Sequence, residues 1–237
     1  IAAEDTRHTR HLLTHFGIPT PLISYFEHNK LARLDAVLNA LAAGDVALVS
    51  DAGTPALSDP GYELVRAALA AGHTVSPIPG PSAILAALIA SGLPTDSFTY
   101  LGFLPRKAAE RRRFLQQIAH EPRTLGVLEA PHRLLQTLAD AQAELGERPL
   151  AVARELTKLH EEIFRGTAAQ AHAHFSATPP RGEITLVIAA APAAPETWDD
   201  ERLRAALAGL LASGLSRAEA ARQLAAQSGR ARREIYD

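Results

Sequence analysis

Apolar runs of strand type alternate with segments of helical periodicity along most of this chain. Near-continuous apolar runs such as "VALV" at 46–49 are typical of strands that are buried on both faces. Strands are predicted at 45–50, 74–79, 98–102, 124–129, 150–154 and 183–190. Helices are predicted at 4–15, 30–43, 62–71, 81–91, 107–120, 132–145 and 167–175. This alternation predicts an α/β fold with mostly parallel strands in its first half.

Two stretches of turn-forming and small residues interrupt the pattern. The first is "SGLPTD" at 91–96, and the second is the Ala- and Pro-rich "AAPAAPETWDD" at 190–200. We therefore expect three parts: an N-terminal α/β domain at 1–94, a C-terminal α/β domain at 95–192, and a linker with a helical tail at 193–237.

The tail carries a clear helix-start signal. Ser216 followed by Glu219 is a capping box, in which each side chain accepts a hydrogen bond from the other residue's backbone N–H. A helix, a short Gly-containing turn and a second helix fit a helix-turn-helix-like unit. A helical hairpin that packs on the body fits equally well.

Composition narrows the function classes only modestly. The chain has 237 residues, a net charge of −2 and no Cys, so disulfides and thiolate chemistry are excluded. A reducing cytoplasm is the simplest setting, and no apolar run approaches the roughly 18 residues of a membrane span. The opening Ile1-Ala2-Ala3 resembles the last turn of a buried strand. We therefore expect an N-terminal strand and helix that are missing from this sequence.

Two loops rich in small residues each follow a predicted strand and precede a predicted helix. They are "VSDAGTPALSDPG" at 49–61 and "PIPGPSA" at 77–83. Gly and Ala let backbone amides approach a ligand closely, and ligands of open α/β sheets bind beyond the carboxyl ends of strands. Neither loop matches GxxxxGK[ST] or GxGxxG, which disfavours ordinary ATP or dinucleotide binding.

The first loop contains two aspartates with different expected roles. Asp59 precedes Pro60 and is predicted to be a helix N-cap with Pro at the first helical position. Asp51 lies too far before the helix to cap it. Its carboxylate either binds an amine or ribose hydroxyl of a ligand or ties down the turn.

Six motifs occur in an order that points to a known family. They are "VSDAGTPALSDPGYELV", "PIPGPSA", "FLPRK", "LEAPHRL", "ARELTKLHEE" and "RGEITLVI". Together they resemble the tetrapyrrole-methylase superfamily, and more closely its ribosomal RNA branch, which the opening "AAEDTRHTRHLL" and the tail also match. The resemblance covers essentially the whole chain, although the family's first strand and the loop after it are missing.

The resemblance implies both a fold and a reaction. It implies two α/β domains with S-adenosylmethionine (SAM) in the cleft between them, a homodimer, and 2′-O-methylation of a cytidine in 16S ribosomal RNA. The partner would be that RNA or the small ribosomal subunit. The residues that would bind SAM are Asp51, Ala52, Gly53, Thr54, Pro55, Ser82, Ala83, Gly182, Glu183 and Thr185.

A ribose hydroxyl is a poor nucleophile until its proton leaves, so a general base is sought. The preferred catalytic candidates are Glu129, at the end of a predicted strand, and His132. The alternative for Glu129 is an ion pair with Arg133 or Arg154, and His132 also fits a helix start. Further candidates are Glu155 and Lys158. Orientation of the substrate alone is the remaining alternative.

Two basic clusters are candidates for RNA phosphate contacts, because phosphate binding needs local density of positive charge. Their residues are Arg7, Arg10, Arg106, Lys107, Arg111, Arg112 and Arg113. The alternative for each cluster is a solvated helix face. His8 and His11 lack a third ligand at a zinc-like spacing, so no metal site is predicted.

Two other functions stay open on the residues alone. A methyltransferase of a tetrapyrrole or another small molecule would share the small-residue loops but would not need the arginine cluster or the tail. A non-catalytic RNA-binding protein would need the basic clusters only.

Overall fold

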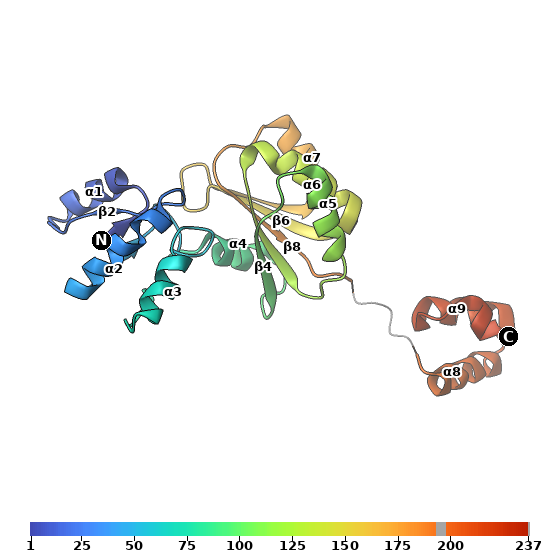
Figure 1. Cartoon of the computed structure of the whole chain (residues 1–237). Helices are drawn as coiled ribbons and strands as arrows, with labels where there is room; N and C mark the ends of the chain where they lie inside the picture. The colour runs from blue at the N-terminus through green and yellow to red at the C-terminus, as the bar shows by residue number, and fades with distance from the viewer. Residues whose placement is uncertain (193–197, 237) are drawn as a thin grey trace. The chain divides into compact units, whose positions relative to one another are not determined.

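A computed structural model describes residues 1–192 and 198–236, and the chain forms two compact units (Figure 1). The body consists of Ile1–Ala119 and Arg123–Ala189, and the remaining described residues form the tail unit. The predicted linker at 190–200 lies partly outside the described residues. The further division of the body into domains at 1–94 and 95–192 stays a prediction.

The first part of the body contains a small parallel sheet with the strand order β2-β1-β3. Ala2 pairs with Ile23 on one side and Leu48 on the other, and these short strands pack with Tyr25 and Val37. The expectation that "IAA" ends a strand and that early strands are parallel is confirmed. The elements are β1 (Ala2–Ala3), α1 (Thr6–His15), β2 (Ile23–Ser24), α2 (Lys30–Ala43), β3 (Leu48–Val49), α3 (Tyr62–Ala70) and α4 (Ala83–Ser91).

The rest of the body forms a five-stranded sheet with the order β4-β5-β8-β6-β7. The β4–β5 pair is parallel and the other three pairs are antiparallel. The strands are β4 (Phe98–Phe103), β5 (Thr124–Glu129), β6 (Pro149–Arg154), β7 (Glu162–Thr167) and β8 (Ile184–Ile188). The helices are α5 (Ala108–Gln117), the 3-10 helix η1 (Pro131–Arg133), α6 (Leu134–Leu145) and α7 (Ala168–Ala177).

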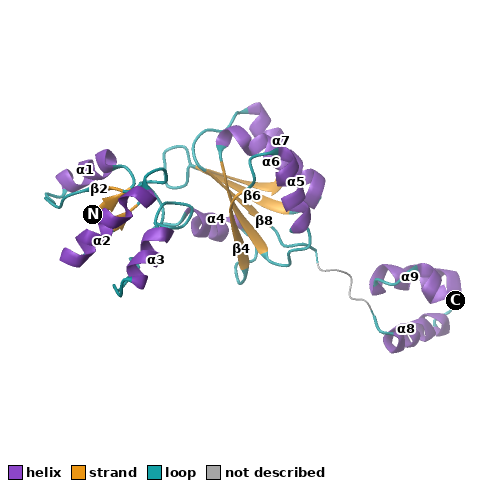
Figure 2. Cartoon of the chain, in the orientation of Figure 1, coloured by secondary structure: helices purple, strands orange, loops and turns teal. Residues whose placement is uncertain are grey.

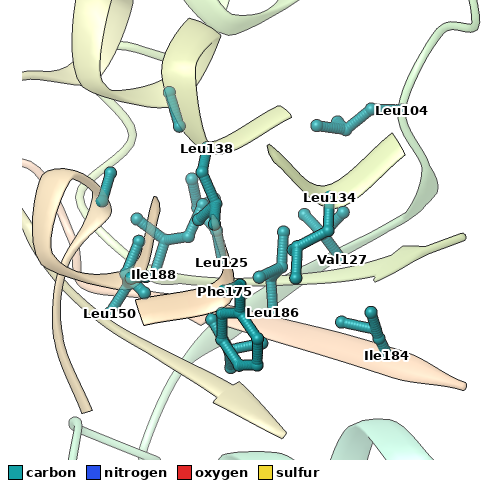
Figure 3. Packing of buried hydrophobic residues seen from close by; sticks show 14 of the residues in the cluster. Leu104, Leu125, Val127, Leu134, Leu138, Leu150, Phe175, Ile184, Leu186 and Ile188 are labelled. Atoms are coloured by element: carbon teal, nitrogen blue, oxygen red, sulfur yellow. The ribbon is translucent and has the colours of Figure 1, made fainter. Parts of the chain in front are cut away.

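Helices cover both faces of this larger sheet (Figures 1 and 2). Helices α5, α6 and α7 lie on one side, and α4 packs against β6 and β8 on the other. Every residue of β8 is buried, so its two sets of alternating side chains enter two separate cores. Ile184, Leu186 and Ile188 join the α6 and α7 side, which Figure 3 shows, while Val187 faces the α4 side.

The α/β fold predicted from the pattern is confirmed, but one strand prediction is wrong and two strands were missed. Residues 74–79 form no strand: Pro77 and Pro79 have no N–H with which to join a ladder. The strands β2 and β7 were not predicted. Strand β2 has only two residues, and β7 is an edge strand whose charged residues Glu162 and Arg165 break the apolar run.

The tail unit contains α8 (Asp200–Ala212), α9 (Arg217–Ser228) and α10 (Arg232–Tyr236). Leu203, Leu224 and Ile235 form its core. The capping box is confirmed: the Ser216 hydroxyl accepts the Glu219 N–H at 3.3 Å, and the Glu219 carboxylate accepts the Ser216 N–H at 3.1 Å.

Gly126 of β5 allows α4 to lie close to the sheet. A Cβ at this position would overlap the side chain of Ile84. We predict that Gly126→Val lowers the free energy of unfolding by about 1–3 kcal/mol, because overpacking forces strained side chains or backbone shifts. Gly44→Val is the matched control, since a Cβ at Gly44 meets nothing within 4 Å. Equal urea-denaturation midpoints for the two variants would contradict this packing role.

Candidate functional site

A cavity of about 510 Å³ in the body is lined by loops that follow the first sheet and by strand ends of the second. Its size lies within the range of roughly 300–1,000 Å³ that is common for small-molecule sites. Pro55 and His132 were predicted as site residues but are not part of the lining. The predicted site residues that the structure brings together are Asp51, Ala52, Gly53, Thr54, Ser82, Ala83, Glu129, Gly182, Glu183 and Thr185.

The loop after β3 is tied to the start of α1. Gly53 has a φ of 70°, a left-handed conformation that favours glycine. The Asp51 carboxylate accepts the Asp5 N–H at 3.3 Å, and the Asp51 N–H donates to the Glu4 carboxylate at 3.2 Å. Of the two roles considered for Asp51, the turn-fixing one is therefore present. A ligand contact stays a prediction for this carboxylate at the cavity wall.

The second small-residue loop is joined to the first. The Thr54 hydroxyl donates to the carbonyl oxygen of Pro81 at 2.8 Å. The Ser82 hydroxyl caps α4 by accepting the Leu85 N–H at 3.5 Å. Both predicted loops therefore belong to one wall of the cavity.

A second wall comes from the segment before β8. The Glu155 carboxylate accepts hydrogen bonds from the Glu183 N–H and from Lys158 Nζ, both at 2.9 Å. The bond from Lys158 lowers the pKa of Glu155 below its usual value. A Cβ on Gly182 would overlap the Glu155 side chain, so this arrangement requires glycine. Glu155 and Lys158 thus position the Gly182–Glu183 backbone at the cavity.

The segment from Ala56 to Gly61 holds an unusual backbone beside the cavity. Ala56 and Ser58 have φ values of 68° and 63°, which non-glycine residues adopt at a cost. The Ser58 hydroxyl lies 2.5 Å from the Tyr100 hydroxyl of β4. A contact between distant segments therefore helps to hold the strained loop.

Asp59 corrects a sequence prediction. It was expected to be the N-cap of the helix, but α3 begins at Tyr62 with Gly61 in the N-cap position. Asp59 instead lines the cavity and is half-buried. Burial, followed by the nearby charge of Glu4, raises its pKa from the ordinary 3.8 to about 6.

The cavity is acidic. Five acidic residues belong to its lining: Glu4, Asp51, Asp59, Glu129 and Glu183. Within the described part of the chain, the lining contains no Lys, Arg or His. A cavity of this kind favours a ligand with a positive charge and disfavours a polyphosphate.

The two preferred base candidates do not present reactive groups to the cavity. The Glu129 side chain is fully buried, and its oxygens accept the Ala130 N–H at 2.8 Å and the Thr137 hydroxyl at 2.6 Å. Arg133 lies 3.2 Å from the same carboxylate, so the ion-pair alternative is the one present. His132 is exposed on η1. The geometry does not support either residue as the base.

The basic cluster on α5 divides into inward and outward residues. Arg111 is fully buried and lies 2.6 Å from Asp140 of α6. The prediction that Arg111 contacts RNA is therefore wrong, because the helical period turns its side chain into the core. Arg112 and Arg113 are exposed, as are Arg106 and Lys107.

The second basic cluster lies on α1. Arg7 and Arg10 are exposed and border a surface hollow together with His11 and His15. Arg7 also pairs with the N-cap residue Asp5 at 3.0 Å. These arginines remain accessible for the predicted RNA contact.

Neither a metal site nor a membrane-spanning helix is found among the residues that the structure describes. Among the residues that the structure describes, no group of His, Cys, Asp and Glu is arranged to hold a metal ion. No helix in the same residues has the length and apolar character needed to cross a membrane.

Sequence reasoning missed several residues of the cavity. Tyr100 and Phe103 lie on β4, and their position near a strand end was the available signal. No local sequence signal placed Glu4 and Asp59 at the cavity. They come from segments that are far apart in the chain and become neighbours only in the folded protein.

Comparison with known proteins gives the family. The family model "Tetrapyrrole (Corrin/Porphyrin) Methylases" matches residues 1–172. The chain therefore belongs to the tetrapyrrole methylase family, as the six motifs indicated. Enzymes of this family use SAM as the methyl donor, and the acidic cavity suits that cation.

The names of individual relatives are more specific than the name of the family. A "Ribosomal RNA small subunit methyltransferase I" of Synechocystis sp. is 54% identical over 100% of this chain and 86% of its own length. A protein of the same name from Xylella fastidiosa is 45% identical over 100% of this chain and 87% of its own. The solved methyltransferase CobJ shares the fold, with a TM-score of 0.53 and 20% identity over 72% of this chain and 74% of its own.

Gly53 provides a direct test of the cavity as the cofactor site. A Cβ there meets no protein atom within 4 Å, but the φ of 70° is unfavourable for a β-branched residue. We predict that Gly53→Val abolishes SAM binding in calorimetry while the fold survives. Gly72→Val is the matched control, because Gly72 has a φ of 81°, open surroundings and a position outside the cavity. Parent-like SAM affinity in Gly53→Val would exclude this loop as the site.

Proposed function

We propose that this chain transfers the methyl group of SAM to the 2′-hydroxyl of a cytidine in 16S ribosomal RNA. The observation that carries the proposal is the acidic cavity bounded by the two small-residue loops and by Gly182–Thr185. The names of relatives that match the whole chain support RNA over a tetrapyrrole as the substrate. Action on ribosomal RNA would place the protein in the cytoplasm.

The cavity residues fit the cofactor by charge and by shape. When bound, SAM supplies a methyl group that is already activated by a positive sulfonium. Asp51 and Glu183 provide negative charge for a cationic ligand, and Gly53 and Ala83 provide backbone without bulky side chains. The main contribution of the chain is therefore to hold the reactants in the correct orientation and to exclude water from them. Correct orientation lowers the barrier to methyl transfer.

A methyl-transfer assay tests the function. We predict that labelled SAM transfers its methyl group to 16S RNA or to the small subunit, and that digestion of the product yields 2′-O-methylcytidine. A label recovered in a tetrapyrrole but not in RNA would favour the small-molecule alternative. SAM binding without transfer to either substrate would contradict the proposed reaction.

The exposed arginines of α5 are proposed to contact RNA phosphates. Replacing Arg112 and Arg113 by Ala should weaken RNA binding and flatten the plot of log K against log salt by about 0.7 per lost contact with single-stranded RNA. SAM affinity should not change, because neither residue lines the cavity. Arg33→Ala with Arg66→Ala removes two exposed charges elsewhere and serves as the control. Equal salt slopes for the two double variants would leave the α5 face as a solvated surface.

A homodimer is proposed from the family resemblance and from one apolar surface. Leu85 and Ile89 lie one turn apart on α4 and are 50% and 77% exposed. Burial of such side chains in a dimer would remove apolar area from water. Sedimentation at micromolar concentration should show a dimer, and Leu85→Asp with Ile89→Asp should shift it to monomer. A monomeric parent would contradict the proposal.

A further inference from the structure

Asp59 differs in its partners from two other acidic residues of the cavity lining. Glu129 and Glu183 lie within ion-pair distance of Arg133 and Lys158. Asp59 has a hydrogen bond to Ser50 and faces three carboxylates, those of Glu4, Asp51 and Glu183. It lines the cavity without capping the helix that follows it. Its position is therefore not explained by local structure.

The backbone around Asp59 is held in a costly conformation. Ala56 and Ser58 both adopt left-handed φ values, and the contact between the Ser58 and Tyr100 hydroxyls fixes the loop on β4. Gly61 closes the loop against the sheet, because a Cβ there would lie 2.8 Å from Leu48 Cδ2. Strain that the surrounding structure maintains is typical of functional positions. Here it presents the Asp59 carboxylate to the cavity.

The electrostatic surroundings suit a proton acceptor. Burial and the charges of Glu4, Asp51 and Glu183 raise the pKa of Asp59 to about 6, while the bond from Ser50 opposes them. Two of those neighbours have basic partners of their own: Lys158 Nζ lies 3.2 Å from the Glu183 carboxylate, and His8 Nδ1 lies 3.7 Å from the Asp51 carboxylate. A general base works best when its pKa is close to the working pH.

We propose that Asp59 is the catalytic residue that accepts the proton of the ribose hydroxyl during methyl transfer; this inference rests on the function proposed above. A lone pair of the ribose oxygen forms the new O–CH₃ bond while the bond between carbon and sulfur breaks. The electron pair of the broken bond stays on sulfur, which becomes a neutral thioether. The hydroxyl proton passes to the Asp59 carboxylate and from there to water.

The test combines single-turnover kinetics with direct binding. At saturating SAM, Asp59→Asn should slow methylation of 16S RNA by roughly 10²–10⁴-fold, the usual contribution of a general base. The parent rate should rise with pH in the acid range and then level off, whereas the residual rate of Asp59→Asn should lack this rise. Asp59→Glu should recover part of the rate. Glu147→Gln, an exposed carboxylate outside the cavity, should match the parent.

Two readouts do not depend on catalysis. In the SAM-free protein, one ¹³C-labelled Asp carboxyl should titrate near pH 6 and be missing in Asp59→Asn. Because the folded-state pKa is raised above 3.8, the folded protein holds the proton more tightly, and parent stability should fall as pH rises from 3.8 to about 6. Asp59→Asn should lack this loss, so it should be at least as stable as the parent at pH 7.5.

The outcomes separate the inference from the proposed function. An active parent with a parent-like rate and pH profile in Asp59→Asn overturns the proton-acceptor role alone. If Asp59→Asn weakens SAM but not S-adenosylhomocysteine, and saturating SAM restores the rate, Asp59 binds the cation and the proposal fails. A folded parent that binds SAM but methylates no RNA overturns the proposed function, and the acceptor role with it.

Discussion

The body of this protein depends on one fully buried strand. Strand β8 lies between β5 and β6, antiparallel to both, and it sends alternate side chains into two cores. Because neither face of β8 is solvated, its register is fixed from both sides. That register sets the beginning of β8 at Ile184 opposite the end of β5 at Glu129. The segment Gly182–Thr185 therefore lies at the cavity. The small-residue loops form the opposite wall.

The cavity is assembled from segments that would be unremarkable separately. Small residues allow close approach of backbone, while carboxylates from distant parts of the chain concentrate negative charge. Burial raises the pKa of Asp59, and repulsion by the neighbouring carboxylates of Glu4, Asp51 and Glu183 raises it further. A cationic methyl donor would offset that repulsion, which links the local electrostatics to the chemistry of the family.

Two arginines that are two positions apart on α5 have opposite roles. Arg111 joins α5 to α6 through Asp140 inside the body, while Arg113 on the same helix faces solvent. A buried charge requires its partner, so Arg111 contributes to helix packing and not to a binding surface. The outward arginines of α5 and α1 are exposed, and none of them lines the acidic cavity.

The sequence by itself determined the α/β class, most helices, the capping box of the tail and the two small-residue loops, because these follow from local periodicity and residue chemistry. It also carried the family motifs. Tertiary structure alone decided which charges are buried and which carboxylates meet. Asp59 next to Pro60 matches a helix cap locally, and Glu129 at a strand end resembles an exposed base. Only folding reveals that Glu4 faces the first and that Arg133 and Thr137 engage the second, since electrostatics and packing act through space and not along the chain.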